Sequence, residues 1–317
     1  MSSPHSNEQE KYFPLGSTLS LRLEHGCANW KPEVTIIKLI QPVTISPVME
    51  VMLQTESGLE TKAILKLYDR RFATGLRRHI KVEPWTPATE EIYKQYVLQG
   101  RADKLFELLD EPSDDEKSID SDFDDEEEHD DNLKIGQNEG FLHYYSCNLY
   151  SREVRAYESL RDLQERMIPK FLARIRLPSR DTDIPEQFRK YFDIRGILIE
   201  YIEGFNLSEL EIKAPKSQWQ VICDNAIDIV HLIGDHGILN NDVRPENFLV
   251  RSNPEGKYQV FQIDFSDAHH RDGLSWETWQ ERKYSFDEEG AIGLVMKLLL
   301  KGGIEFERSS KWLEYDE

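Results

Sequence analysis

The stretch NDVRPENFLV, at residues 241–250, places a carboxylate and an amide five residues apart, just ahead of an apolar run. Asp242 can accept or orient a proton, and Asn247 can offer a neutral oxygen to a hard cation. Asp264 follows the apolar run VFQI and can supply the charged oxygen that such a cation prefers. A carboxylate buried in part at such a position is costly unless it meets a cation or a donor. The three side chains together suit phosphoryl transfer, with Mg²⁺ held by Asn247 and Asp264.

Two further residues could complete this chemistry. Transfer of a phosphoryl group from ATP requires a cation on the donor phosphates, groups that hold Mg²⁺, and a carboxylate that orients the attacking hydroxyl. Lys66 lies in the strand-like run AILKLY, from which its ammonium can reach the α- and β-phosphates. Glu153 begins a later helical pattern, where it can pair with Lys66 and hold it extended.

Each of these residues also has an ordinary structural interpretation. Lys66 could be a surface lysine of an edge strand, because lysine is seldom buried without a partner. Glu153 could lie on a solvated helix face. Asp242 could form a turn beside Pro245, with Asn247 capping that turn. The occurrence of every role in one chain, each on a suitable element, favours the chemical interpretation.

The first part of the chain predicts an antiparallel sheet followed by a helix. Runs rich in β-branched and aliphatic residues alternate with Pro, Ser or Gly, at residues 19–25, 34–40, 48–53 and 62–68. Thr86 and Pro87 then suit the N-cap and the first position of a helical insert over residues 86–109.

The second part predicts mostly helices. Apolar residues recur at helical spacing within residues 151–166, 217–237 and 288–300, and strand-like runs lie at 170–177 and 195–202. A β-rich part followed by a helical part predicts an α+β protein with two lobes.

The net charge of −20 is concentrated in one place. Residues 110–131 hold fourteen Asp or Glu and a single Lys, so this run carries −13 of the total. Such a run repels itself and has almost nothing to bury, which predicts a disordered acidic insert over residues 110–139. The sign of the charge disfavours nucleic acid as a direct partner. No apolar run reaches the ~18 residues of a membrane helix and the first residues lack a signal-peptide pattern, so we expect no membrane partner and an intracellular location, cytoplasm or nucleus.

These motifs resemble those of the protein-kinase superfamily, over roughly residues 34–300. AILK is similar to the lysine motif of the family's third strand, EVRAYESL to its αC helix, NDVRPEN to its HRDxxxxN catalytic loop and IDFS to its DFG motif. LIEYIEGFNL is similar to the linker that binds adenine. The resemblance implies a bilobal protein-kinase-like fold of the α+β class, a β-rich N-lobe, a reduced helical C-lobe, and ATP with Mg²⁺ as cofactors.

The resemblance also implies roles for residues that the spacing alone does not assign. Ile199 takes the gatekeeper position, and Glu200, Tyr201 and Ile202 face the purine. Val48 joins them in binding the nucleotide. Separately, Arg244, two residues after Asp242, places a cation where it can touch the transferring phosphate.

The phosphate-covering loop departs from the family pattern. In QPVTIS the residues Gln41, Val43 and Ser46 stand where glycines are expected, so a looser grip on ATP is predicted. Asn240 and Asn241 stand in the His-Arg positions of the catalytic loop, which argues against control by a phosphorylated activation loop.

The short helical part is similar to that of the RIO and lipopolysaccharide kinases and of the kinase-like proteins widespread in filamentous fungi. Ser266 stands in the position of the DFG glycine, and in this respect the sequence resembles the aminoglycoside and choline phosphotransferases. The predicted organisation is an N-terminal extension with a strand (1–33), a kinase-like N-lobe carrying both inserts (34–202) and a reduced kinase-like C-lobe (203–317).

The leading interpretation is an atypical protein kinase that transfers the γ-phosphate of ATP to a hydroxyl of an unknown protein. Two alternatives stay open. One is a phosphotransferase for small hydroxylated molecules of the aminoglycoside or choline type. The other is a pseudokinase that binds nucleotide or a partner without turnover.

Overall fold

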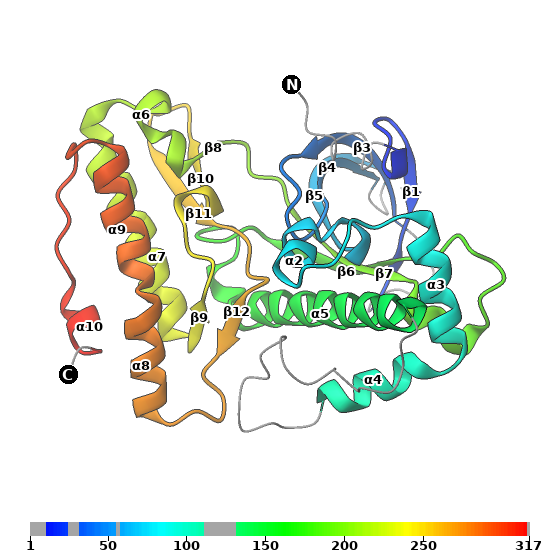
Figure 1. The fold of residues 1–317 in the computed structure, drawn as a ribbon. Coiled ribbons are helices and arrows are strands. Elements are labelled where there is room, and N and C mark those ends of the chain that lie inside the picture. The colour runs from blue at the N-terminus through cyan, green and yellow to red at the C-terminus, as the bar shows by residue number, and fades with distance from the viewer. Residues whose placement is uncertain (1–10, 25–31, 55–57, 111–130, 316–317) are drawn as a thin grey trace. The chain divides into compact units, whose positions relative to one another are not determined.

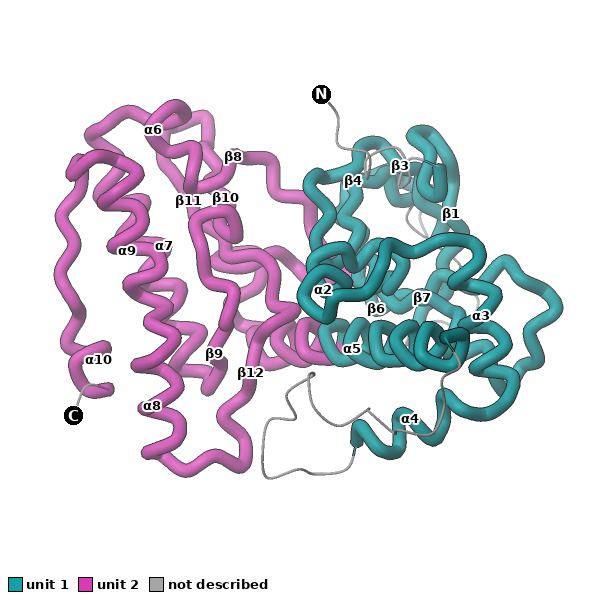
Figure 2. Tube along the Cα trace, viewed as in Figure 1, with its two compact units in different colours: residues 1–150, 173–198 teal, residues 151–172, 199–317 magenta. Residues whose placement is uncertain are grey.

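The computed structural model describes residues 11–24, 32–54, 58–110 and 131–315. The chain divides into two compact units, shown in teal and magenta in Figure 2. Unit 1 comprises residues 1–150 and 173–198, and unit 2 comprises residues 151–172 and 199–317. Unit 1 holds the large sheet and unit 2 is mainly helical, so the predicted α+β class with a β-rich and a helical part is confirmed. The unit boundaries differ from the predicted division at 33/34 and 202/203.

Unit 1 is built on a sheet that has seven strands within the described residues, in the order β1-β3-β4-β5-β7-β6-β2 (Figure 1). The strands are β1 (Thr18–Ser20), β2 (Arg22–Leu23), β3 (Glu33–Ile40), β4 (Val48–Gln54), β5 (Glu60–Tyr68), β6 (Phe171–Leu177) and β7 (Ile194–Glu200). Strands β1, β3, β4 and β5 pair antiparallel in sequence order, as predicted. Gly196 in β7 lies against β5 so closely that a Cβ would meet the main-chain oxygen of Lys66 at 2.6 Å, so only glycine fits there.

Residues 13–21 contribute to the core of the sheet. Phe13, Leu19 and Leu21 are almost fully buried, packed with core residues of β3, β4 and β5. The sequence predicted a strand at residues 19–25 within the sheet, and the structure pairs β1 with β3 and β2 with β6.

Helices α2 (Thr74–His79), α3 (Pro87–Leu98), α4 (Arg101–Asp110) and α5 (Asp131–Ser159) follow the central strands. Thr86 caps α3, with its hydroxyl accepting from the Thr89 amide, as its position before Pro87 predicts. The helices α3 and α4 pack on α5 at Gly136 and Gly140, where a Cβ would meet side chains of Tyr96 and Leu105 at 2.7 and 2.8 Å.

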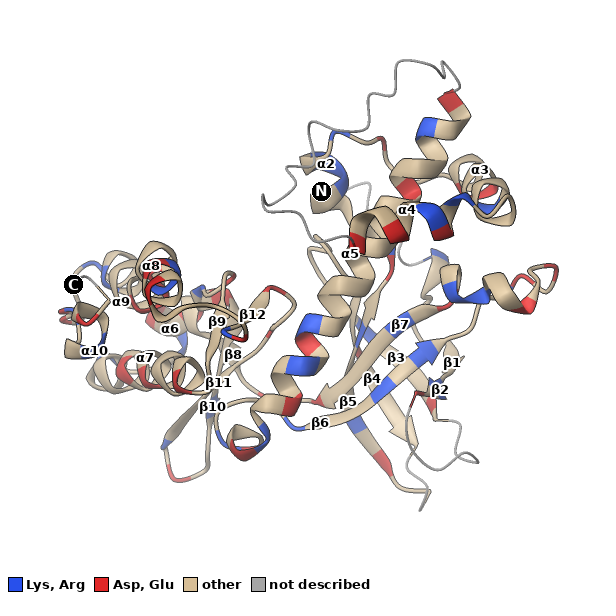
Figure 3. Cartoon of the chain, turned by 90° about the horizontal axis from the view of Figure 1, so that it is seen from below, with Lys and Arg blue, Asp and Glu red and all other residues tan. Residues whose placement is uncertain are grey.

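The predicted disordered insert over residues 110–139 is wrong at both ends. Asp110 ends α4, and α5 begins at Asp131. Glu139 is buried and binds the guanidinium groups of Arg70 and Arg77, so residues after 130 do have something to bury. Basic and acidic segments are interleaved along α5 in Figure 3. Residues 111–130 lie outside the described part of the chain.

Unit 2 is a group of helices with two small sheets. Its helices are α6 (Leu210–Lys213), α7 (Trp219–Asp235), α8 (Trp276–Phe286), α9 (Glu288–Leu299) and α10 (Ser310–Leu313). Its strands are β8 (Phe205–Asn206), β9 (Ile238–Asn240), β10 (Phe248–Ser252), β11 (Tyr258–Gln262) and β12 (Ala268–His270), which pair as β11-β10-β8 and β12-β9. Residues 151–159 of α5 belong to this unit. Among the described helices, none is long and apolar enough to cross a membrane.

Candidate active site

The loop between β9 and β10 carries Asp242 and Asn247. A short 3₁₀ turn at Pro245–Asn247 curls the chain back, so that Asn247 Nδ2 donates to Asp242 Oδ2 at 2.9 Å and to the Asp242 main-chain oxygen at 2.8 Å. These bonds occupy the amide nitrogen of Asn247 and leave its oxygen to serve as an acceptor or a metal ligand. The five-residue spacing is therefore what closes this loop.

Asp242 has an unusual electrostatic environment for a loop carboxylate. Burial raises its pKa, as do the nearby carboxylates of Asp264 and Asp267. The guanidinium of Arg244, 3.2 Å from Asp242 Oδ2, and the Asn247 amide act in the opposite direction. A carboxylate with a raised pKa is a better proton acceptor than an ordinary one, which suits the predicted role.

Asp264 follows β11 in a left-handed backbone conformation, with φ of 65°. Its Oδ1 accepts from the Ser266 hydroxyl at 2.7 Å and from the Ser266 amide at 3.2 Å. Ser266 thus orients this carboxylate, a function that sequence reasoning did not assign to it.

Asn240, the last residue of β9, joins these two loops. Its Nδ2 donates to the main-chain oxygen of Asp264 at 2.9 Å, and its Oδ1 accepts from the Asp242 amide at 3.3 Å. The Ile263 amide also donates to the Asn247 main-chain oxygen at 2.8 Å. Asp242, Asn247 and Asp264 are therefore held together by hydrogen bonds within unit 2.

Glu153 lies on the part of α5 that belongs to unit 2. It is buried, and its Oε1 accepts from the Phe265 amide at 3.3 Å, one residue after Asp264. One turn along the helix, the Tyr157 ring packs edge-on against the Phe265 ring, with centroids 5.3 Å apart. The helix is thereby fixed to the segment that carries Asp264.

Lys66 and Val48 belong to unit 1, so their approach to the unit 2 residues stays a prediction. They are paired directly across β4 and β5. Lys66 is 6% exposed and its Nζ lies 5.6 Å from the centre of the Tyr68 ring. Because β5 is a central strand, the interpretation of Lys66 as a surface lysine of an edge strand is wrong.

The predicted adenine-binding residues lie at the end of β7 and just after it, in unit 2. Ile199 and Ile202 are buried, whereas Glu200 and Tyr201 are half-buried. Glu200 accepts from the Lys170 amide at 3.0 Å. No contact with a nucleotide follows from this placement, and the role stays a prediction.

The glycine-poor loop between β3 and β4 is bonded to α2. The Thr44 main-chain oxygen accepts from the Gly75 amide at 2.6 Å, and the Thr74 hydroxyl donates to the Val43 oxygen at 2.9 Å. Ser46 in the same loop is buried. The main chain of this loop is held by hydrogen bonds within its own unit, and the looser grip on ATP stays a prediction.

A set of ion pairs that sequence reasoning missed fixes the segment after Asp264. Arg152 Nη1 donates to Asp267 Oδ1 at 3.1 Å, and His269 Nε2 lies 3.2 Å from the same oxygen. Arg155 pairs with Asp272. A weak signal was available, because Arg152 and Arg155 stand three residues apart, flanking Glu153 and Val154, and so share one helix face.

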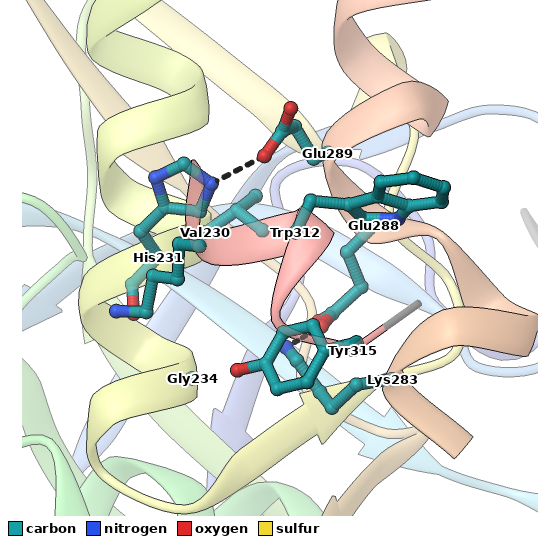
Figure 4. A pocket seen from close by; sticks show the side chains of 9 residues that line it. Val230, His231, Gly234, Lys283, Glu288, Glu289, Trp312 and Tyr315 are labelled. Atoms are coloured by element: carbon teal, nitrogen blue, oxygen red, sulfur yellow. Dashed lines mark hydrogen bonds and ion pairs between the residues drawn. The ribbon is translucent and has the colours of Figure 1, made fainter. Parts of the chain in front are cut away.

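A second missed group is bonded to the end of β9, just before the loop that carries Asp242. Glu288, at the start of α9, accepts from the Asn240 amide at 2.9 Å through Oε1, and its Oε2 pairs with Lys283 of α8. Both side chains are buried. They line a cavity of about 20 Å³ together with His231, Glu289 and Trp312 (Figure 4).

The segment after α9 closes this cavity. Ser309 donates to Glu289 from its hydroxyl at 2.5 Å and from its amide at 2.8 Å, and Arg308 binds Asp287 through both guanidinium nitrogens. Phe306 packs so closely on Gly293 that no Cβ would fit there. Residues 306–309 thus hold the start of α9, where Glu288 supports the loop.

We expect Glu288→Ala to lower the free energy of unfolding by about 2–4 kcal/mol, because it leaves the Lys283 ammonium and the Asn240 amide buried without partners. Denaturant unfolding measures the loss, and hydrogen exchange at the Asn240 amide reports it locally. Glu288→Gln keeps an acceptor for this amide and should protect it better than alanine does. Equal exchange at Asn240 in wild type and Glu288→Ala would contradict this support role.

The donor set near Asp264 consists of oxygen atoms, which suit magnesium. No group of three or more His, Cys, Asp or Glu side chains in the described ranges is arranged to hold a metal ion. Mg²⁺ prefers oxygen ligands and is commonly bound by one or two protein groups together with substrate phosphates. An amide oxygen from Asn247 and a carboxylate from Asp264 fit that requirement.

Comparisons with known proteins give structural similarities but no match in sequence. No protein-family model matches the sequence, and no curated protein matches it. The structure is similar to that of a Rio2 kinase–ADP/Mg²⁺–phosphoaspartate complex from Chaetomium thermophilum, with 10% sequence identity and a TM-score of 0.46, over 98% of this chain and 73% of that one. The side-chain geometry of unit 2, and not this similarity, supports the function proposed next.

Proposed function

We propose that this protein is a phosphotransferase of the protein-kinase-like type that uses ATP and Mg²⁺. The observation that carries this proposal is the hydrogen-bonded group of Asp242, Asn247 and Asp264, which Asn240 joins within unit 2. A structural turn needs no such group, because ordinary turn residues satisfy their own main chain.

Each residue has a role that its surroundings support. Asp242 orients the acceptor hydroxyl and takes up its proton, which the raised pKa favours. Asn247 and Asp264 hold Mg²⁺, which neutralises charge on the donor phosphates. Lys66, held extended by Glu153, contacts the α- and β-phosphates, and Arg244 stabilises the transferring phosphate. Val48 and residues 199–202 receive the purine.

One observation favours a nucleotide-binding module without turnover as the second candidate. The loop at residues 41–47 lacks glycine, and two of its carbonyl oxygens are bonded to α2, so the loop is less free to close over the γ-phosphate. If the protein is an active enzyme, its acceptor is either a protein or a small hydroxylated molecule. Incubation of each class with labelled ATP shows which one receives the phosphate.

Thermal unfolding with millimolar ATP tests metal-dependent binding. Ligand saturation at about 100 times the Kd stabilises a protein by about 2.7 kcal/mol, so the wild type should melt several degrees higher with ATP and Mg²⁺. EDTA should remove most of this shift, and Asp264→Asn should weaken it. An unchanged shift in EDTA, or no shift at any ATP concentration, would overturn the proposed site.

A further inference from the structure

Unit 1 contains a cavity of about 310 Å³ away from the glycine-poor loop. Its walls come from the end of β5 and the turn after it, from α5, and from the segment joining β6 to β7. The lining side chains that matter here are Tyr12, Tyr68, Arg71, Arg180 and Tyr191. This volume is within the range of small-molecule sites in proteins.

The acidic groups in the walls already have partners. Asp69 accepts from Arg71 through both carboxylate oxygens, at 2.9 and 2.7 Å. Glu90 accepts from Arg70 at 2.7 Å. Asp193 accepts from the Ser179 amide at 2.9 Å. The negative charge of these carboxylates is therefore already partly neutralised by donors in the cavity walls.

The basic groups, by contrast, retain donors. Arg71 commits Nε and Nη2 to Asp69, and its Nη1 makes no hydrogen bond with any described residue. Arg180 forms no ion pair within the described ranges and lies exposed at the rim. Planar guanidinium groups with spare donors suit a carboxylate, which they can bind through two parallel hydrogen bonds.

The remaining walls are aromatic. Tyr12 stands edge-on to Phe72 and Trp85, with ring centres 5.7 and 5.5 Å apart, and the Tyr191 hydroxyl is fixed on Asp103. Tyr68 packs edge-on against Tyr150. Rings held in fixed orientations offer faces and edges to a flat aromatic ligand at little entropic cost.

We propose that this cavity is a binding site for a small aromatic carboxylate, whose ring lies among Tyr12, Tyr68 and Tyr191 and whose carboxylate meets Arg71 and Arg180. The site is separate from the residues proposed for phosphoryl transfer and does not depend on that function. The Tyr68 ring, which lines the cavity, lies 5.6 Å from the Lys66 ammonium. A ligand in the cavity therefore touches the neighbour of a proposed nucleotide-binding residue.

The test uses three probes of one shape on the full chain: 2-naphthoate, 2-naphthamide and 2-naphthamidine. Ligand-observed NMR and isothermal titration calorimetry should show that the carboxylate binds, that the neutral amide binds about 10-fold more weakly, and that the cation does not compete. Equal binding of carboxylate and amide, or binding of none of the three probes, would overturn the proposal.

Variants locate the site. Arg180→Glu should weaken 2-naphthoate binding by about 10-fold, because it reverses the charge at the rim. Arg78→Glu, an exposed arginine on α2, is the matched control and should leave affinity unchanged. Ser179→Trp fills the cavity and should abolish binding, with an unchanged circular dichroism spectrum showing that the protein still folds. Full affinity in both Arg180→Glu and Ser179→Trp would place the ligand elsewhere and contradict the assignment.

Discussion

Asp242→Asn should reduce γ-phosphate transfer by about two to four orders of magnitude while leaving ATP affinity close to that of the wild type. The amide keeps the size of the carboxylate and still accepts a hydrogen bond, but it cannot take a proton from the acceptor hydroxyl. Initial rates with labelled ATP measure the loss. Asp228→Asn, an exposed aspartate on α7 in the same unit, is the matched control and should keep full activity.

The pH dependence gives this prediction a second readout. Burial raises the pKa of Asp242, so the folded state disfavours its ionised form. The ionised carboxylate therefore costs stability, and this cost appears as the pH rises from the unfolded pKa of about 3.8 through the folded one. Asp242→Asn should melt at or above the wild-type temperature at pH 7, and the gap should close near pH 3. A variant that is both fully active and less stable at pH 7 would remove Asp242 from its role.

Glu139→Ala should lower the free energy of unfolding of the protein by about 3–5 kcal/mol. Glu139 is 1% exposed and meets two arginines that are nearly as buried. Arg77 binds it through both terminal nitrogens, at 2.7 and 2.9 Å. Truncation leaves two buried cations with Glu90 as the nearest remaining acid, bonded to Arg70. Denaturant unfolding followed by circular dichroism measures the change.

Two control variants distinguish the effect of losing the ion pairs from the effect of replacing any glutamate on a helix. Glu107→Ala alters an exposed glutamate of α4 in the same unit and should change stability by less than about 0.5 kcal/mol. Glu139→Gln keeps hydrogen-bond acceptor capacity without the charge and should fall between wild type and alanine. A cost below about 1 kcal/mol for Glu139→Ala would mean that the arginines find other partners.

Much of the fold follows from local patterns in the sequence. The four antiparallel strands, the Thr86 cap, and helices α7 and α9 have strong periods or caps, and these predictions are confirmed. The spacing of Asp242 and Asn247 predicted that their side chains act together, and both residues lie between β9 and β10. Features that are determined by residues close in the sequence could therefore be predicted.

Features that depend on residues distant in the sequence could not be predicted. Glu139 in the first turns of α5 is bonded to Arg70 and Arg77, more than sixty residues away, and composition alone assigned it to the acidic run. Helix α8 was missed because its apolar period is weak, although Ser275 and Thr278 form a readable cap. Glu288 could not be assigned to Asn240, because nothing local links α9 to β9.

The burial of residues 13–21 bears on how the protein can be shortened. A chain that began at residue 34, where the kinase-like motifs begin, would lose Phe13, Leu19 and Leu21 from the core and β1 from the edge of the sheet. Strand β3 would then present unpaired amides and carbonyls beside newly uncovered apolar surface, a combination that promotes association between molecules. Insoluble expression of such a fragment would therefore reflect the exposed edge of β3 and not a failure of the helical unit to fold.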